Sequence, residues 1–214
     1  MKSNLDQWKT MQEREYFEKH PRYKGLLAFG KETVPAIEQF TKLDSSQTVV
    51  VVGCGYGREC VQLALFVRQV YGIDVNPLII KKAMEFTRAQ GMTNFTGVIV
   101  DNWEQEIPGD IDIVYSMVVM QHLTRDLVYD YFNHLPKKLS PSGIMIIQFL
   151  EKFTDIYHDA EIKLYEPQVS WTKEEIEQLA EKHDLQVEIK TIKATELAVW
   201  HWCGFRKRED VPAK

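Results

Sequence analysis

The stretch Thr48–Gly57, TVVVVGCGYG, decides the fold. Its first half, Thr48 to Val52, is a continuous β-branched run, which predicts a strand covered on both faces within a parallel sheet. Its second half contains three glycines and leads directly into a helical stretch from Arg58 to about Arg68. Glycines at such a turn let the backbone bend sharply and approach a ligand where Cβ atoms would collide. The alternative interpretation is a tight strand-to-helix turn that binds nothing.

Strands and helices alternate downstream of this stretch. We expect strands at residues 69–73, 95–100, 112–117 and 144–149, with helices at residues 77–90 and 124–139. Pro141-Ser142-Gly143 predicts a turn into the fifth strand. The pattern is typical of a doubly wound, Rossmann-like α/β sheet, in which ligands bind at the carboxyl ends of the strands.

The end of the chain predicts one more helix and a hairpin. Thr172 and Glu175 form a candidate capping box for a helix that reaches about Lys182. The runs at residues 187–194 and 197–205 are close enough to pair as antiparallel strands, which brings the expected sheet to seven strands. We expect His201 to be an edge-strand histidine without a catalytic role.

The whole chain, 1–214, is expected to be a single domain. Its expected parts are an N-terminal helical cap (1–45, with a helix at residues 34–43), a core (46–150), an insertion (151–171), and a last helix with the closing strands (172–214).

Composition narrows the function classes. The chain has 214 residues with a formal net charge of -5, which disfavours non-specific nucleic-acid binding. No stretch has the ~20 apolar residues of a membrane span, and the polar first twenty residues do not resemble a secretory signal. The three cysteines lack CxxC spacing, so we expect no disulfide framework, no metal site and a cytoplasmic location.

Polar residues follow the second and third expected strands. Asp74 ends the second strand and is placed to accept hydrogen bonds from a ribose diol, or alternatively to cap the helix that begins after Asn76. Asp101 and Asn102 follow the third strand and could bind an adenine edge, or alternatively form a solvated loop. Arg58 stands where the dinucleotide fingerprint GxGxxG needs its third glycine.

Taken together, these motifs resemble the class I S-adenosylmethionine-dependent methyltransferases, in their small-molecule branch, from about Thr48 to Phe149. The matching segments are VVVVGCGYG, VYGIDVN, VIVDNW, IDIVYSMVVMQHL and LSPSGIMIIQ, and HWCGFRK is similar to the closing hairpin of that family. Ser142-Gly143 departs from the two glycines of many relatives, which affects only the turn.

The resemblance implies S-adenosyl-L-methionine as cofactor and S-adenosyl-L-homocysteine as product. It also implies that the N-terminal helices act as a lid. The residues implied to bind the cofactor are Gly53, Cys54, Gly55, Gly57, Asp74, Val75, Asp101, Asn102, Trp103, Ser116 and Met117.

The candidate catalytic residue is His122, in the loop that leaves the fourth strand. A histidine can accept a proton near neutral pH, which a hydroxyl acceptor would require; the alternative is a structural histidine. Candidate substrate residues are Tyr16 and Arg22 near the N-terminus, and Tyr157, His158 and Trp171 in the aromatic-rich insertion. The alternative for that aromatic cluster is a local core.

We therefore expect a methyltransferase that O-methylates a hydroxyl of a sugar or secondary metabolite. The nearest alternative is an amine N-methyltransferase, because the sequence does not fix the acceptor atom. An RNA or protein methyltransferase would show salt-sensitive binding to its substrate. An NAD-dependent oxidoreductase is disfavoured by Arg58, and a non-catalytic methyltransferase-like subunit by the intact glycine and acid motifs. The oligomeric state is not predicted.

Overall fold

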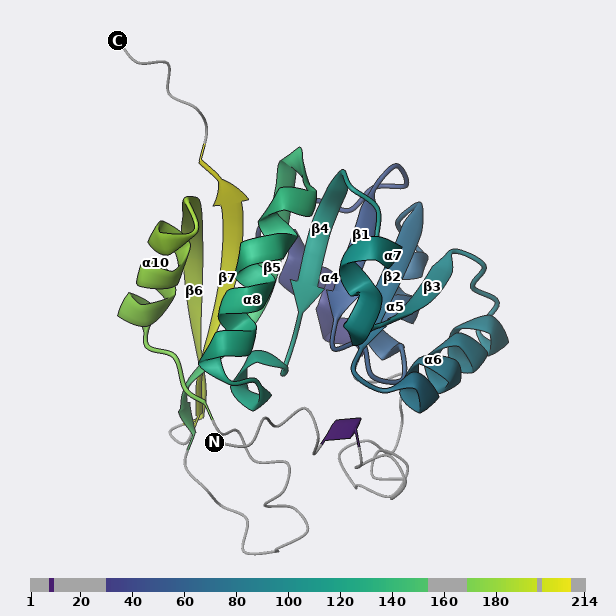
Figure 1. Ribbon diagram of the computed structural model, residues 1–214, viewed down its shortest axis with the longest axis horizontal. Helices are drawn as coiled ribbons and strands as arrows, with labels where there is room; N and C mark the ends of the chain where they lie inside the picture. Colours follow the sequence, from purple (N-terminus) through teal and green to yellow (C-terminus); the bar gives the residue numbers. More distant parts are fainter. Residues whose placement is uncertain (1–7, 10–29, 154–168, 196–197, 209–214) are drawn as a thin grey trace, which may run out of the picture.

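The structure, a computed structural model, describes residues 8–9, 30–153, 169–195 and 198–208. Within these residues a seven-stranded sheet has the order β3-β2-β1-β4-β5-β7-β6 (Figure 1). The strands are β1 (Thr48–Val52), β2 (Gln69–Asp74), β3 (Phe95–Ile99), β4 (Ile111–Ser116), β5 (Leu139–Phe153), β6 (Leu185–Thr195) and β7 (Ala198–Lys207). β1 to β5 pair in parallel, and β7 is antiparallel to both neighbours. The predicted α/β class and the closing antiparallel pair are confirmed.

Helices cover both faces of the sheet and create two cores. One core contains Ile37, Leu63 and Ile80, from α4 (Thr33–Glu38), α5 (Arg58–Ala64) and α6 (Pro77–Ala89). The other contains Trp103, Phe132 and Leu179, from α7 (Trp103–Glu106), α8 (Arg125–Lys138) and α10 (Lys173–Lys182). The 3-10 turns are η3 (Gly30–Glu32), η4 (Val100–Asn102) and η5 (Met120–His122). All five residues of β1 are buried, as the continuous apolar run predicts for a strand covered on both faces.

Two helices are shorter than their sequence patterns predicted. α4 ends at Glu38 instead of Leu43, and α5 ends at Ala64 instead of Arg68. The side-chain amide of Asn94, just before β3, donates to the carbonyl oxygens of Ala64 and Val67, each at 2.9 Å. These bonds satisfy the carbonyl of Ala64, the last residue of α5, and that of Val67 just beyond it, which compensates for the helical bonds lost where the helix ends.

The predicted turn at Pro141–Gly143 lies inside β5, which begins at Leu139 and continues to Phe153. The pairing of β4 with β5 jumps from Ile111 with Leu139 to Ile113 with Ile144. Three additional residues are therefore accommodated within β5, and the expected break between helix and strand is absent. Because β5 includes Glu151, the expected insertion at residues 151–171 begins as a strand.

The capping box at the start of α10 is confirmed. The Thr172 hydroxyl accepts a hydrogen bond from the Glu175 backbone N–H at 3.2 Å, and a Glu175 carboxylate oxygen accepts one from the Thr172 N–H at 2.8 Å. Of the expected N-terminal helical cap, Trp8 and Lys9 are helical, and residues 1–7 and 10–29 lie outside the described residues.

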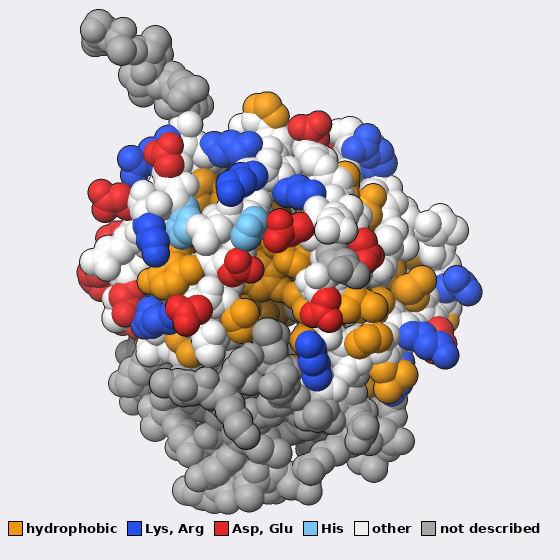
Figure 2. Space-filling view, in the orientation of Figure 1, with side chains coloured by type: hydrophobic (Ala, Val, Ile, Leu, Met, Phe, Trp, Pro, Cys, Tyr) orange, Lys and Arg blue, Asp and Glu red, His pale blue; other side chains and the backbone are white. Residues whose placement is uncertain are grey.

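The surface carries charges of both signs. Basic and acidic side chains are interspersed on the face shown in Figure 2, with hydrophobic side chains between them. No described helix is long and apolar enough to cross a membrane.

Candidate functional site

The strand order reverses between the neighbouring strands β1 and β4. β2 and β3 lie on one side of this point, and β5 lies on the other side. Loops that leave adjacent strands at such a switch point diverge and leave a crevice in which α/β proteins bind ligands. Here the loop after β1 begins at Gly53, and the loop after β4 contains Val119. A Cβ atom on Gly53 would lie 2.3 Å from Val119 Cγ2, so the two loops touch at the base of the crevice.

The glycine turn has the backbone that its sequence predicts. Gly53, Gly55 and Gly57 have φ angles of 71°, 50° and 81°, in the left-handed region that side chains disfavour. The backbone N–H groups of Gly53 and Cys54 both donate to the Ile73 carbonyl, at 2.8 and 3.0 Å, which fixes the turn to β2. A Cβ atom on Gly55 would meet nothing within 4 Å, so the described structure leaves open space at this turn.

Asp74 lies beside the glycine turn at the end of β2. Its Oδ2 accepts a hydrogen bond of 3.0 Å from the Gly55 N–H. Burial raises the pKa of Asp74 to about 6, although hydrogen bonds from Gly55, Val75 and Asn76 oppose the shift. Asn76, not Asp74, caps α6, because Asn76 Oδ1 accepts the Leu78 N–H at 2.7 Å. The helix-cap alternative for Asp74 is therefore wrong.

The loop after β3 is contacted by the N-terminal segment. Lys9 places its Nζ 3.8 Å from Oδ1 of the exposed Asp101, and its carbonyl oxygen accepts a bond of 2.6 Å from Asn76 Nδ2. Trp103 is buried and packs on Tyr131, with ring centroids 5.7 Å apart, so its side chain belongs to the core. The side chain of Asn102 lies outside the described residues.

The loop after β4 contains a strained residue. Ser116 is buried, and its hydroxyl donates to the Val52 carbonyl at 3.1 Å. Val118 has a φ angle of 60°, which is a genuine outlier for a β-branched residue, and its N–H donates to Gln148 Oε1 at 3.2 Å. Such strain persists only where the surrounding structure fixes it, and it concentrates at functional sites.

His122 ends η5 in the same loop. The ring of Trp8 meets the His122 ring edge-on, with centroids 4.9 Å apart, and Gln121 Nε2 lies 3.3 Å from His122 Nε2. Burial lowers the pKa of His122 to about 4. The imidazole is therefore neutral near pH 7, but it is a weaker base than an exposed histidine.

The predicted substrate residues are not brought together by the described structure. Trp171 is fully buried, packs 5.4 Å from the Phe149 ring and lies under the Arg125 guanidinium. Trp171 is therefore a core residue in this structure, which corrects the expectation that it contacts a substrate. Tyr16, Arg22, Tyr157 and His158 lie outside the described residues.

The structure also corrects the expectation for His201. β7 lies between β5 and β6, so His201 is internal to the sheet, and only 2% of its side chain is exposed. Its Nε2 lies 2.6 Å from Glu151 Oε2 and its Nδ1 lies 2.9 Å from Thr191 Oγ1. Glu151 was not among the predicted site residues, although its charge at the end of an apolar strand is a visible signal. Among the described residues, no group of three or more His, Cys, Asp or Glu side chains could hold a metal ion.

Comparison with known proteins finds one family model that matches part of the chain. Residues 49–143 match the family described as a methyltransferase domain. No match is found among curated proteins.

Three solved structures show the same fold. Magnesium protoporphyrin IX methyltransferase from Synechocystis, solved with bound S-adenosylhomocysteine, has a TM-score of 0.70 at 15% identity, over 95% of this chain and 98% of that chain. Phosphoethanolamine N-methyltransferase 2 from Haemonchus contortus has a TM-score of 0.68 at 17% identity. The match covers 90% of this chain but 59% of the Haemonchus chain. The mitomycin 7-O-methyltransferase MmcR has a TM-score of 0.62 at 14% identity, over 91% of this chain and 60% of that chain.

Proposed function

We propose that the chain transfers a methyl group from S-adenosylmethionine to a small molecule, because residues 49–143 match a methyltransferase-domain family and the fold is that of S-adenosylmethionine-dependent methyltransferases. The hydrogen bond between Gly55 and Asp74 is the observation that carries this proposal, because it joins the glycine turn to the acid that such a cofactor needs. The donor supplies an activated methyl group, so the main task of the chain is to align it with the acceptor.

The described residues fit an adenosyl ligand. The open space at Gly55 would admit the ligand close to the backbone, and the Asp74 carboxylate can accept hydrogen bonds from a ribose diol. Asp101, with the backbone of Asn102, would flank the adenine, while Cys54, Val75 and Met117 would line the pocket. Ser116 would act through the backbone, because its hydroxyl is bonded to Val52.

His122 is the proposed proton acceptor for a hydroxyl nucleophile. It is neutral at physiological pH because burial lowers its pKa to about 4, so one of its two ring nitrogens carries no proton. The low pKa limits its driving force, since a general base works best with a pKa near the operating pH. We expect modest rather than large acceleration from proton transfer.

The proposed acceptor is a hydroxyl of a sugar or secondary metabolite. Support comes from the named 7-O-methyltransferase among the structural neighbours. The N-methyltransferase neighbour favours an amine as the second candidate.

Calorimetric titration with S-adenosylmethionine, S-adenosylhomocysteine and NAD tests the proposal. We expect micromolar binding of the two adenosyl ligands, no binding of NAD, and loss of adenosyl binding in Asp74→Ala. Asp110→Asn is the matched control. Asp110 is exposed and precedes β4, so it lies at the opposite end of the strands from the candidate site. Binding of NAD without the adenosyl ligands would overturn the proposal. A labelled-methyl screen of sugars, phenols and amines would then identify the acceptor class.

A further inference from the structure

β5 extends past its neighbour β4 at the end of the sheet where the candidate site lies. The last pairing of β4 with β5 joins Ser116 to Ile147, yet β5 continues to Phe153 along β7 alone. Residues 148–153 therefore project beyond the carboxyl end of β4, where the candidate site lies.

Glu151 is the bulged residue of this projecting segment. The pairing with β7 passes from Leu150 opposite Trp200 to Lys152 opposite Val199, which leaves Glu151 without an opposite residue. A β-bulge turns a side chain out of its regular direction, and bulges are frequent beside active sites.

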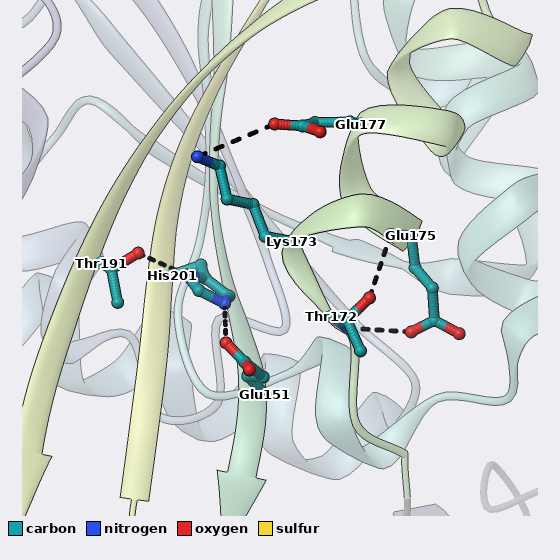
Figure 3. A network of polar contacts seen from close by, with 7 residues as sticks. All are labelled: Glu151, Thr172, Lys173, Glu175, Glu177, Thr191 and His201. Atoms are coloured by element: carbon teal, nitrogen blue, oxygen red, sulfur yellow. Dashed lines mark hydrogen bonds and ion pairs between the residues drawn. The ribbon is translucent and has the colours of Figure 1, made fainter.

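A buried histidine holds the Glu151 carboxylate in place. Figure 3 shows His201 between Glu151 and Thr191, three side chains from the neighbouring strands β5, β7 and β6. The 2.6 Å contact between His201 Nε2 and Glu151 Oε2 is within hydrogen-bond distance and ties the carboxyl group to the buried ring. The Thr191 hydroxyl bonds to Nδ1, so both ring nitrogens of His201 have a partner. The carboxylate side chain remains 39% exposed, although its position is fixed by a group that is 2% exposed.

The short segment from Val169 to Trp171 connects the end of β5, which contains Glu151, to the loop after β4, which contains His122. The Val169 N–H donates to the Gln121 carbonyl at 3.1 Å, and the Trp171 N–H donates to the Leu150 carbonyl at 2.8 Å. Val169 and Trp171 are two residues apart, a span of at most about 7 Å between their Cα atoms. The chain neighbours of His122 and Glu151 are thus joined across one side of the candidate site.

Resting on the proposed function, we propose that Glu151 binds a cationic group, an ammonium, on the small-molecule acceptor, and that His201 is its positioning residue. A fixed, partly exposed carboxylate attracts a cation and repels an anionic group such as phosphate. Other charges lie nearby at the start of α10: Lys173, paired with Glu177 at 3.9 Å, and the exposed Glu174. His201 is close enough to Glu174 to contribute to lowering the pKa of that carboxyl, after the larger effects of hydrogen bonds and of Lys173.

The test measures acceptor binding to the chain loaded with S-adenosylhomocysteine. Ligand-observed NMR would compare matched pairs that differ in charge: ethanolamine with ethylene glycol, benzylamine with benzyl alcohol, tyramine with tyrosol, and glucosamine with glucose. We expect the wild type to prefer the amine in at least one pair. Glu151→Gln should weaken that amine at least tenfold and change its neutral partner less than twofold.

Two further variants separate recognition from structure. Glu174→Gln removes a nearby exposed charge and should leave the preference unchanged. His201→Phe should reduce the preference without changing S-adenosylhomocysteine affinity, since a purely structural role would not distinguish amines from alcohols. If S-adenosylhomocysteine binds but no amine is preferred, or if Glu151→Gln retains the preference, the inference is overturned. Failure of S-adenosylhomocysteine to bind the wild type would instead overturn the proposed function.

Discussion

The Gly55 N–H donates a 3.0 Å hydrogen bond to Oδ2 of Asp74, so the turn after β1 and the acid that ends β2 form one unit. The bond holds a carboxylate where burial opposes its charge, because desolvation raises the pKa of Asp74 to about 6. A charge kept at an energetic cost in a crevice is typical of a functional site rather than of a structural one.

Because the buried charge of Asp74 costs stability, we expect Asp74→Asn, which removes that charge, to stabilise the folded chain. Between pH 3.8 and about 6 the folded chain holds a proton on Asp74 that the unfolded chain has lost, so stability falls as the pH rises through this window. The shift of about two pKa units corresponds to roughly 3 kcal/mol at neutral pH, as an upper estimate. Asn keeps an oxygen that can accept the Gly55 N–H.

We therefore expect Asp74→Asn to raise the free energy of unfolding at pH 7 by about 1–3 kcal/mol while weakening S-adenosylhomocysteine at least tenfold. Urea unfolding at pH 7 and pH 4 checks this, and the gain should shrink at pH 4, where the wild-type acid is already protonated. A variant less stable than the wild type at pH 7 would show that the charge is not costly.

The contact between Trp8 and His122 predicts that removing the Trp8 ring changes the pKa of His122. Burial lowers the pKa of His122 from 6.5 to about 4, and the Trp8 ring lies against the imidazole. Trp8→Ala should open the imidazole to water and raise its pKa by about one unit or more. NMR titration of the His122 ring proton measures the change, with the partly exposed His134 as internal control.

The lowered pKa of His122 also makes the stability of the folded chain depend on pH. Because the unfolded chain protonates His122 near pH 6.5 and the folded chain only near pH 4, the contribution of His122 to stability is lost as the pH falls through this window. Trp8→Ala should flatten that decline. An unchanged His122 titration would mean that other groups bury the imidazole.

The sequence predicted the centre of the molecule better than its edges. The apolar run and the glycines specify β1 and the turn locally, because glycine readily adopts the left-handed backbone observed at Gly53, Gly55 and Gly57. The end of α5 depended instead on Asn94, thirty residues from Ala64, whose amide takes the last carbonyls. A long-range bond of this kind leaves no periodicity in the sequence.

Long-range contacts also explain why the residues on the acceptor side could not be predicted from the sequence. Trp171 belongs to the aromatic-rich insertion after the fifth strand, which suggested a substrate contact, but tertiary packing against Phe149 and Arg125 buries it. His201 and Glu151 are fifty residues apart and meet only because β7 pairs with β5. Pairing partners across a sheet are set by topology, so the sequence could supply each residue but not the pair.

The glycine turn predicts stability losses of different size at Gly55 and Gly53. Alanine at Gly55 meets open space, so its stability cost is the left-handed backbone alone, about 1–2 kcal/mol. Its methyl group would occupy the side on which we expect the ligand, so S-adenosylhomocysteine should bind at least tenfold more weakly. Alanine at Gly53 adds the overlap with Val119, and we expect a total loss of about 2–5 kcal/mol.

Val119→Ala tests whether that overlap is the cause. It removes the two methyl groups nearest to the added Cβ, so Gly53→Ala should cost at least about 1 kcal/mol less in the Val119→Ala background than in the wild type. Urea unfolding of the four proteins of this double-mutant cycle gives the coupling energy. Additive losses would place the strain in the Gly53 backbone alone and remove the contact between the two loops as a determinant of the crevice.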